Sequence, residues 1–219
     1  VTMKKGADGK YEVAEKKGAV ISMADYAADA DLTKSLAPFA DTALKDAETV
    51  IGKREGGPLV AENEVKGIPQ AQVADSAMID LINEVQMYYT GAKVSGAALF
   101  IEDANMQPGE IKKSDTSLVY KYTNTLYKIE MTGKQLKDYM EWTAAYFQTY
   151  EDGDLTIGFN PDFRLYNYDM FSGVNYDINI SKAPGSRIEN LTWPDGAAVK
   201  DDEKLEVALN NYRVNSHLM

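Results

Sequence analysis

The chain offers few residues for acid–base, nucleophilic or metal chemistry. It has no cysteine, and its one histidine, His217, is third from the end. A catalytic triad needs an imidazole base and a histidine-ligated site needs several imidazoles, so the composition argues against both; we expect His217 to be an exposed tail residue. The carboxylate runs 151-EDGD-154 and 201-DDE-203 lack the alternating oxygen ligands of a calcium loop, which favours solvated turns. With no P-loop, nucleophile elbow or GxGxxG motif, the residues predict binding rather than cleavage.

Tyrosines and asparagines gather in three clusters. These are 120-YKYTN-124, 166-YNYDMFSGVNY-176 and 210-NNYR-213. Each falls at an expected strand end or in a loop, where side chains converge without disturbing a core. A tyrosine ring offers a stacking face and an asparagine amide can pair with a base edge, a combination that suits a nucleobase. Taken singly, a tyrosine is more often core than site, so the clusters alone leave both interpretations open.

Composition and charge limit the partners. The 219 residues carry a net charge of −11, and 44% are hydrophobic and 26% charged, the balance of a globular protein. Lysines and arginines are scattered, which argues against a nucleic acid polymer, whereas a pocket for one nucleotide needs only a few local donors. No apolar run approaches the ~18 residues that span a bilayer, and no signal segment opens the chain. Its opening residues resemble the middle of a longer protein, and we expect an excised fragment.

Apolar spacing and turn residues predict the elements that carry these clusters. Apolar residues recur at spacings of three and four from Asp25 to Ile51, which predicts a helix. A loop at 52–70, a helix capped by Asp75 or Ser76, a buried strand at 93–101 and a loop at 102–113 are expected next. They are followed by a short helix from Ser114 to near Tyr120, a strand from Thr125 to Met131 and a helix that starts in the capping box Thr132–Gln135. The last expected elements are a loop at 149–169, a period-two strand at 173–180 and short strands to the end. This order predicts the α+β class.

Three segments taken together carry a resemblance to a known family. They are 120-YKYTNTLYKIEMTGKQLKDYME-141, 166-YNYDMFSGVNYDI-178 and 205-LEVALNNYR-213. Together they resemble the C-terminal domain of the 5′-nucleotidase family, and most of all its bacterial branch of 2′,3′-cyclic-nucleotide 2′-phosphodiesterase/3′-nucleotidases. The resemblance runs from the helix near Asp25 to Arg213. It implies one layered α/β/β/α domain with mixed sheets and flanking helices.

The resemblance also implies a division of labour. In that family a separate N-terminal domain holds two divalent metal ions and hydrolyses the ester, while the C-terminal domain clamps the base between two aromatic rings. One ring falls here on Tyr122 and the other on Tyr212. The family's metal-ligand motifs are absent, so the resemblance implies no catalytic residue, metal or cofactor in this fragment, which we expect to be inactive alone. Its role would be to place the phosphate over the metals.

Six further residues are weaker candidates for substrate binding. They are Asn124, Asn175 and Asn210 for base-edge hydrogen bonds, Gly173 for a close backbone approach, Asp169 for a ribose hydroxyl, and Arg213 for a phosphate or ribose. Each has a structural alternative: turn shaping for the asparagines, the start of a strand for the glycine, turn capping for the aspartate and an exposed charge for the arginine. We expect Trp142 and Trp193 to serve in packing.

The chain departs from the family pattern in two places. The asparagine and arginine stretch of classical 5′-nucleotidases should fall near 99-LFIEDAN-105 and is absent, which favours the cyclic-phosphodiesterase branch. The glycine-rich turn that carries a ribose-binding aspartate in many relatives is replaced by 214-VNSHLM-219, so we expect a truncated C-terminal end.

The sequence therefore yields the following organisation. Residues 1–24 form a linker and strand leading from an N-terminal catalytic domain outside this fragment, and residues 25–219 form the nucleotide-binding domain. Expected partners are nucleotides or nucleosides and the N-terminal metallophosphoesterase domain, with no nucleic acid polymer and no membrane span. Family resemblance implies export to the periplasm, cell wall or extracellular space. The alternatives are a non-catalytic extracellular ligand-binding or structural module, and a domain kept only for packing, in which Tyr122 and Tyr212 do not face each other.

Overall fold

The chain divides into two compact units. The computed structural model describes residues 1–102 and 105–218, and its units are Val1–Asp46 and Ala47–Met219, each considered by itself. This division lies well after the boundary expected at residues 24 and 25. The division falls at the end of helix α1 (Ala30–Ala47), and none of the described side chains of this helix is buried.

The first unit holds a hairpin and a helix. Strands β1 (Thr2–Lys5) and β2 (Tyr11–Glu15) pair antiparallel, and a 3-10 turn, η1 (Met23–Asp25), precedes α1. The Asp29 carboxylate accepts the Leu32 backbone N–H at 2.9 Å and so caps the start of α1. The helix is therefore shorter at both ends than the predicted Asp25–Ile51.

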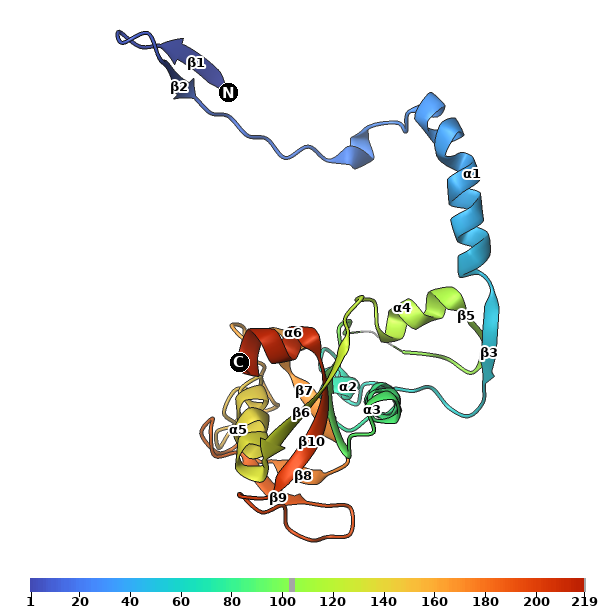
Figure 1. The fold of residues 1–219 in the computed structure, drawn as a ribbon, viewed down its shortest axis with the longest axis vertical. Helices are drawn as coiled ribbons and strands as arrows, with labels where there is room; N and C mark the ends of the chain where they lie inside the picture. Colours follow the sequence, from blue (N-terminus) through green and yellow to red (C-terminus); the bar gives the residue numbers. More distant parts are fainter. Residues whose placement is uncertain (103–104, 219) are drawn as a thin grey trace. The chain divides into compact units, whose positions relative to one another are not determined.

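A four-stranded mixed sheet forms the centre of the second unit (Figure 1). Its order is β6 (Leu126–Thr132), β10 (Lys204–Asn210), β4 (Val94–Ala98) and β7 (Asp169–Ser172). β10 runs parallel to β4 and antiparallel to β6, and β7 runs antiparallel to β4. All five residues of β4 are buried, as its continuous apolar run predicted.

Two helices cover the faces of this sheet. Helix α3 (Ala77–Thr90) lies on one face and α5 (Gly133–Ala144) on the other (Figure 1). The core on the α3 side includes Met78, Ile82, Ala97 and Met170, and the core on the α5 side includes Leu136, Met140, Val207 and Leu209. The α+β class, with mixed sheets and flanking helices, is confirmed.

Both predicted helix caps are confirmed. The Ser76 hydroxyl accepts the Ile79 N–H at 3.5 Å at the start of α3. At the start of α5, the Thr132 hydroxyl accepts the Gln135 N–H at 3.2 Å, and the Gln135 side chain accepts the Thr132 N–H at 2.8 Å. This reciprocal pair satisfies two backbone donors that the first helical turn leaves free.

A small sheet occupies segments for which helix or loop was predicted. Strands β3 (Val50–Arg54) and β5 (Gly109–Lys112) pair antiparallel. The prediction was wrong because Val50 and Ile51 continue the spacing of the preceding helix, while their strand partner is far away in the sequence. Asp103 and Ala104 of the predicted 102–113 loop lie outside the described residues.

The remaining elements are short. Helix α2 (Gln70–Val73) lies between β3 and β5 in sequence and α4 (Thr116–Val119) follows β5; α4 confirms the short helix predicted from Ser114. Strands β8 (Asn175–Ile178) and β9 (Ile188–Thr192) form a separate antiparallel pair, which confirms the period-two strand. The list is completed by the 3-10 turns η2 (Lys113–Asp115) and η3 (Leu165–Asn167), helix α6 (Asn211–Arg213) and a π-helical turn, η4 (Val214–Leu218).

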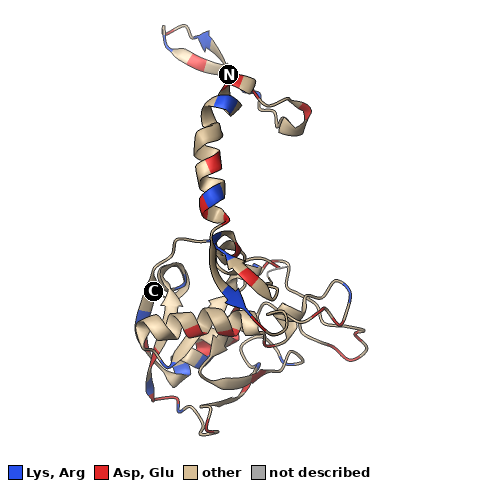
Figure 2. Ribbon diagram, turned by 90° about the vertical axis from the view of Figure 1, so that its right-hand side faces the viewer, with Lys and Arg blue, Asp and Glu red and all other residues tan. Residues whose placement is uncertain are grey.

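Charge is mixed along the chain. Figure 2 shows lysines and arginines interspersed with aspartates and glutamates, without a continuous basic stripe on the described ribbon. Across the described residues, no helix combines the length and apolar character needed to cross a bilayer.

Candidate functional site

The segments that carry Tyr122 and Tyr212 meet at one end of the central sheet. The β6–β10 ladder ends at the pair Leu126 and Asn210. Beyond it, the Thr125 N–H donates to the Asn211 side-chain oxygen at 3.0 Å, and the Asn211 N–H donates to the Thr125 carbonyl at 2.9 Å. This reciprocal contact joins two segments that lie 86 residues apart in the sequence. It brings the backbone near Tyr122 beside the backbone near Tyr212.

Both tyrosine rings have free surface. Tyr122 is 48% exposed and Tyr212 is 43% exposed. The edge of Phe100 supports Tyr122 at a centroid distance of 5.2 Å, and the Lys121 ammonium lies 5.3 Å from the centre of the Tyr122 ring. Tyr212 makes edge contacts with Tyr166 and His217. Each ring is held by neighbouring side chains and remains accessible to a ligand. That the two rings face each other across a bound base stays a prediction.

Asn124 shapes the turn that presents Tyr122. Its amide nitrogen donates to the Tyr120 hydroxyl at 3.0 Å, and burial raises the pKa of Tyr120. The Asn124 oxygen has no protein partner among the described residues and is free to accept. A cavity of about 450 Å³ lies beside this turn, between α3 and the residues Tyr120, Tyr122 and Asn124.

Asp169 and Arg213 form a buried ion pair. Both are 1% exposed. The Arg213 Nε donates to one Asp169 oxygen at 2.6 Å, and Nη2 donates to the other at 3.2 Å. The Tyr139 hydroxyl also donates to this carboxylate, and burial followed by the Asp169 charge raises the pKa of Tyr139. Such a bidentate pair fixes geometry as well as charge.

The remaining Arg213 donors are also used. Nη1 donates to the Asn167 side chain at 3.0 Å and lies 3.2 Å from His217 Nδ1, and Nη2 donates to the Tyr166 carbonyl at 2.7 Å. The guanidinium also lies 5.2 Å from the Trp142 ring centre. An arginine has five N–H donors, so none is left for a phosphate. The expectation of an exposed charge was wrong.

Asn210 belongs to the same support. It is 4% exposed, and its side chain accepts the Arg213 N–H at 2.9 Å, which caps α6. The structure thus gives Asn210, Asp169 and Arg213 structural roles, although the buried ion pair is neither the turn cap expected of Asp169 nor the exposed charge expected of Arg213. They hold the α6 turn, on which Tyr212 is exposed.

Gly173 and Asn175 lie elsewhere. Gly173 has φ +91°, and a Cβ there would lie 2.0 Å from the Lys93 carbonyl, so a tight turn from β7 into β8 requires glycine. The Asn175 amide donates to the Trp193 carbonyl at 3.4 Å. Asn175 lines a second cleft that shares no lining residue with the cavity at Tyr122. The tight turn favours a structural role for Gly173, and the position of Asn175 away from the cavity at Tyr122 favours a structural role for Asn175.

The remaining candidates have structural surroundings. His217 is exposed but belongs to η4 rather than to a loose tail, and its ring lies 4.9 Å from Trp142. Partial burial, then the Arg213 charge, lower the pKa of His217. Trp193 packs against the hydrophobic core on the α5 side, which confirms its packing role, and its indole N–H donates to Glu203 at 3.2 Å.

The described residues offer no donor set for a metal ion. Among them, no group of three or more histidine, aspartate or glutamate side chains lies close enough to share an ion, and the chain has no cysteine. The Asp154 carboxylate accepts the Glu151 N–H at 2.9 Å, which confirms a solvated turn at 151-EDGD-154. Two catalytic metal ions therefore do not fit this part of the chain.

Comparison with known proteins defines the family. Residues 50–217 match the family described as 5′-nucleotidase, C-terminal domain. Since this match covers most of the chain, the protein belongs to that family, and the resemblance seen in the sequence is confirmed.

Two curated relatives are nucleotide phosphoesterases. The chain is 25% identical to the trifunctional nucleotide phosphoesterase protein YfkN of Bacillus subtilis, over 95% of this chain and 16% of YfkN. It is 26% identical to the 2′,3′-cyclic-nucleotide 2′-phosphodiesterase/3′-nucleotidase of Salmonella typhimurium, over 78% of this chain and 27% of that protein. The chain thus spans less than a third of either relative.

Solved structures share the fold. A proposed 5′-nucleotidase from Staphylococcus aureus aligns with a TM-score of 0.75 and 22% identity, over 97% of this chain and 40% of that one. A 5′-nucleotidase precursor from Thermus thermophilus aligns with a TM-score of 0.61 and 16% identity, over 97% of this chain and 39% of that one.

Proposed function

We propose that this chain is the substrate-binding domain of a metal-dependent nucleotide phosphoesterase and holds a nucleobase between Tyr122 and Tyr212. The observation that carries the proposal is the meeting of their two segments through the Thr125 and Asn211 hydrogen bonds. Family membership and the nucleotide-directed activities of the curated relatives support it.

The neighbouring residues have distinct roles in this proposal. The two rings supply stacking, and the free Asn124 oxygen accepts from an amino group on the base edge. The Asp169–Arg213 pair acts by positioning, because it anchors the turn that carries Tyr212 and has no donor left for the ligand.

Catalysis belongs to a different part of the parent protein in this proposal. The described residues offer no metal site, so two divalent ions would be held by a separate metallophosphoesterase domain. Stacking of the base would place the phosphate over those ions and thereby contribute binding energy to the reaction. The resemblance to the cyclic-phosphodiesterase branch supports 2′,3′-cyclic and 3′-nucleotides as substrates, and export to the periplasm, cell wall or extracellular space. The domain alone would not hydrolyse them.

Calorimetric titration with adenosine and 3′-AMP tests the base clamp. Tyr122→Ala and Tyr212→Ala should each weaken binding by about 1–3 kcal/mol, the range for one aromatic–base stack. Tyr88→Ala is the matched control, because Tyr88 is 82% exposed on α3 and lines neither of the two cavities. It should leave the affinity unchanged.

Three results would count against the proposal. Equal affinity in wild type and both site variants would show that the base lies elsewhere. A loss of affinity in Tyr88→Ala of the same size would show a non-specific effect. Absence of binding to the folded chain would show that this domain does not hold the base by itself, as expected of a structural module.

A further inference from the structure

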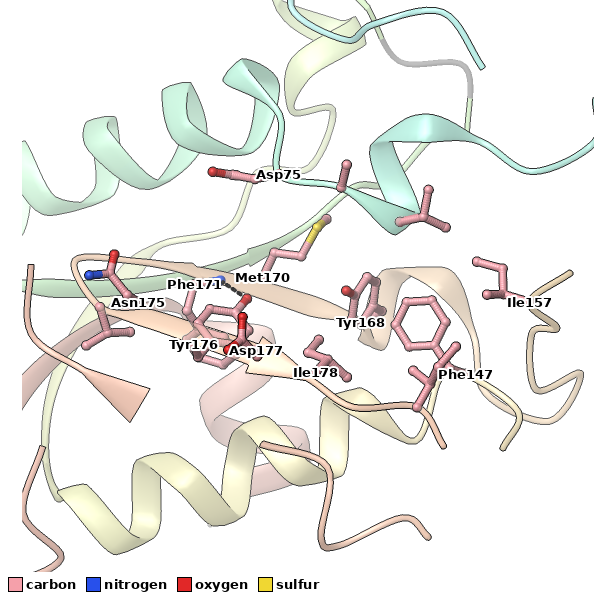
Figure 3. A pocket seen from close by; sticks show the side chains of 14 residues that line it. Asp75, Phe147, Ile157, Tyr168, Met170, Phe171, Asn175, Tyr176, Asp177 and Ile178 are labelled. Carbon is pink, nitrogen blue, oxygen red and sulfur yellow. Dashed lines mark hydrogen bonds between the residues drawn. The ribbon is translucent and has the colours of Figure 1, made fainter. Parts of the chain in front are cut away.

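A second cleft in the domain is separate from the cavity at Tyr122. Its volume is about 480 Å³, within the range of small-molecule sites. Figure 3 shows it between the turn that joins α2 to α3, where Asp75 lies, and the strands β7 and β8. Its inner wall is apolar and aromatic and includes Phe147, Tyr168 and Met170, all of which are buried.

Two tyrosine hydroxyls in this cleft have unused hydrogen-bonding capacity. Tyr168 is only 5% exposed, and its hydroxyl has no protein partner among the described residues. Figure 3 shows this hydroxyl directed into the cleft. The Tyr176 hydroxyl accepts the Phe171 N–H at 3.1 Å, and no described group accepts its own proton. A ligand atom placed in the cleft can form a hydrogen bond with either hydroxyl.

The charge of the cleft is negative. Its described lining residues include Asp75 and Asp177 but no lysine or arginine. One Asp75 oxygen accepts the Ser76 N–H at 2.9 Å and the other has no described partner, while one Asp177 oxygen accepts from Asn190 at 2.6 Å. Partial burial and then the nearby Asp80 raise the pKa of Asp75, and the described lining of the cleft supplies no cation to offset its charge. A phosphate would be repelled here.

We propose that this cleft is a second binding site, for a small organic cation with a flat apolar body. The ammonium group would lie against Asp75 at the rim, and the body would pack on Phe147 and Met170. A hydrogen-bonding atom on the body would meet the Tyr168 hydroxyl. The aromatic wall suits this ligand, because a flat apolar body packs on ring faces while the carboxylate meets the charge. The site shares no lining residue with the cavity at Tyr122 and does not depend on the proposed nucleotide site.

Tyramine and 3-(4-hydroxyphenyl)propionate are the probes for this proposal. They share a phenol ring and chain and differ in the sign of the terminal charge. Calorimetry or nuclear magnetic resonance titration of the whole chain should show saturable binding of tyramine. The anionic probe should bind at least about tenfold more weakly, because its contact with Asp75 is repulsive whereas that of tyramine is attractive.

Two isosteric variants test the residues. Asp75→Asn keeps the oxygen that accepts from Ser76, so the fold should be retained while tyramine binding weakens by about tenfold or more. Tyr168→Phe removes a hydroxyl that has no described protein partner, so stability should not fall, while tyramine binding weakens by about twofold to tenfold. Asp138→Asn is the control for a carboxylate outside this cleft and should change nothing.

Three results of the tyramine titrations would overturn the proposal. They are absence of saturable tyramine binding to the folded protein, equal binding of both probes, or unchanged tyramine affinity in either isosteric variant. A full loss of adenosine binding in Asp75→Asn would also contradict the independence of the two sites.

Discussion

Removal of the Asp169 charge should strongly destabilise the domain. In Asp169→Asn the side chain keeps its shape, but the buried Arg213 guanidinium loses its only described carboxylate partner. Both residues are 1% exposed, so water cannot replace the lost charge. Breaking a buried pair by removing one partner costs about 3–5 kcal/mol. That is a large share of the roughly 5–15 kcal/mol that stabilises a typical domain.

Urea denaturation followed by circular dichroism measures this cost. Asp138→Asn is the matched control, because Asp138 makes a 2.6 Å pair with Lys134 while both side chains stay more than 60% exposed. An exposed pair contributes less than about 1 kcal/mol, so the midpoint should scarcely move in the control and should fall clearly in Asp169→Asn.

A double-mutant cycle with Arg213→Met separates the pair from other effects. The two single changes should each destabilise strongly, and the double variant should lose much less than their sum, because no unpaired charge remains. A cost in Asp169→Asn no larger than in Asp138→Asn would refute the reasoning, as would simple additivity in the cycle. Asp169→Asn should also weaken adenosine binding, since Arg213 adjoins Tyr212.

Two further predictions concern Gly173 and His217. Gly173→Ala should destabilise the domain by more than about 2 kcal/mol, because the new Cβ clashes with the Lys93 carbonyl and alanine disfavours the positive φ at this position. The control Gly185→Ala also has a positive φ, +89°, but has open space around it, so it should destabilise by only about 1 kcal/mol. Equal costs of the two substitutions in urea denaturation would contradict the steric argument. The single histidine should titrate below its ordinary pKa of 6.5 in a proton nuclear magnetic resonance titration, because burial and Arg213 favour neutral His217. Since the unfolded chain binds that proton more readily, stability should decrease as the pH falls through 6.5 and towards the lowered folded value; a midpoint above 6.5 would contradict this contact.

Local patterns predicted the local structure well. The Thr132–Gln135 capping box and the buried run of β4 needed only neighbouring residues, and both are confirmed. The β3–β5 pair was missed because Val50 continues a helical spacing and its partner, Lys112, is remote. Strand partners with such separation leave no local signal.

The same limit applies to the site. Tyr122 and Tyr212 were predicted from aromatic and amide clusters and family resemblance; the structure joins their segments, and their role stays a prediction. The interaction of Asp169 with Arg213 could not be read from either residue's neighbours, because 44 residues separate them. An aspartate and an arginine in polar surroundings are normally predicted to be exposed, since burial of a charge is unfavourable without a partner. Only the fold supplies that partner.

The position of β10 affects how the domain can be synthesised. It is the last strand among the described residues but lies between β6 and β4 in the sheet. Until residues 204–210 leave the ribosome, β6 and β4 cannot form their ladders with it, and their unpaired edges are open to other chains. The central sheet, and the meeting of the two tyrosine segments with it, therefore cannot be completed until translation has passed residue 210. Chaperone protection of the nascent chain matters most during this interval.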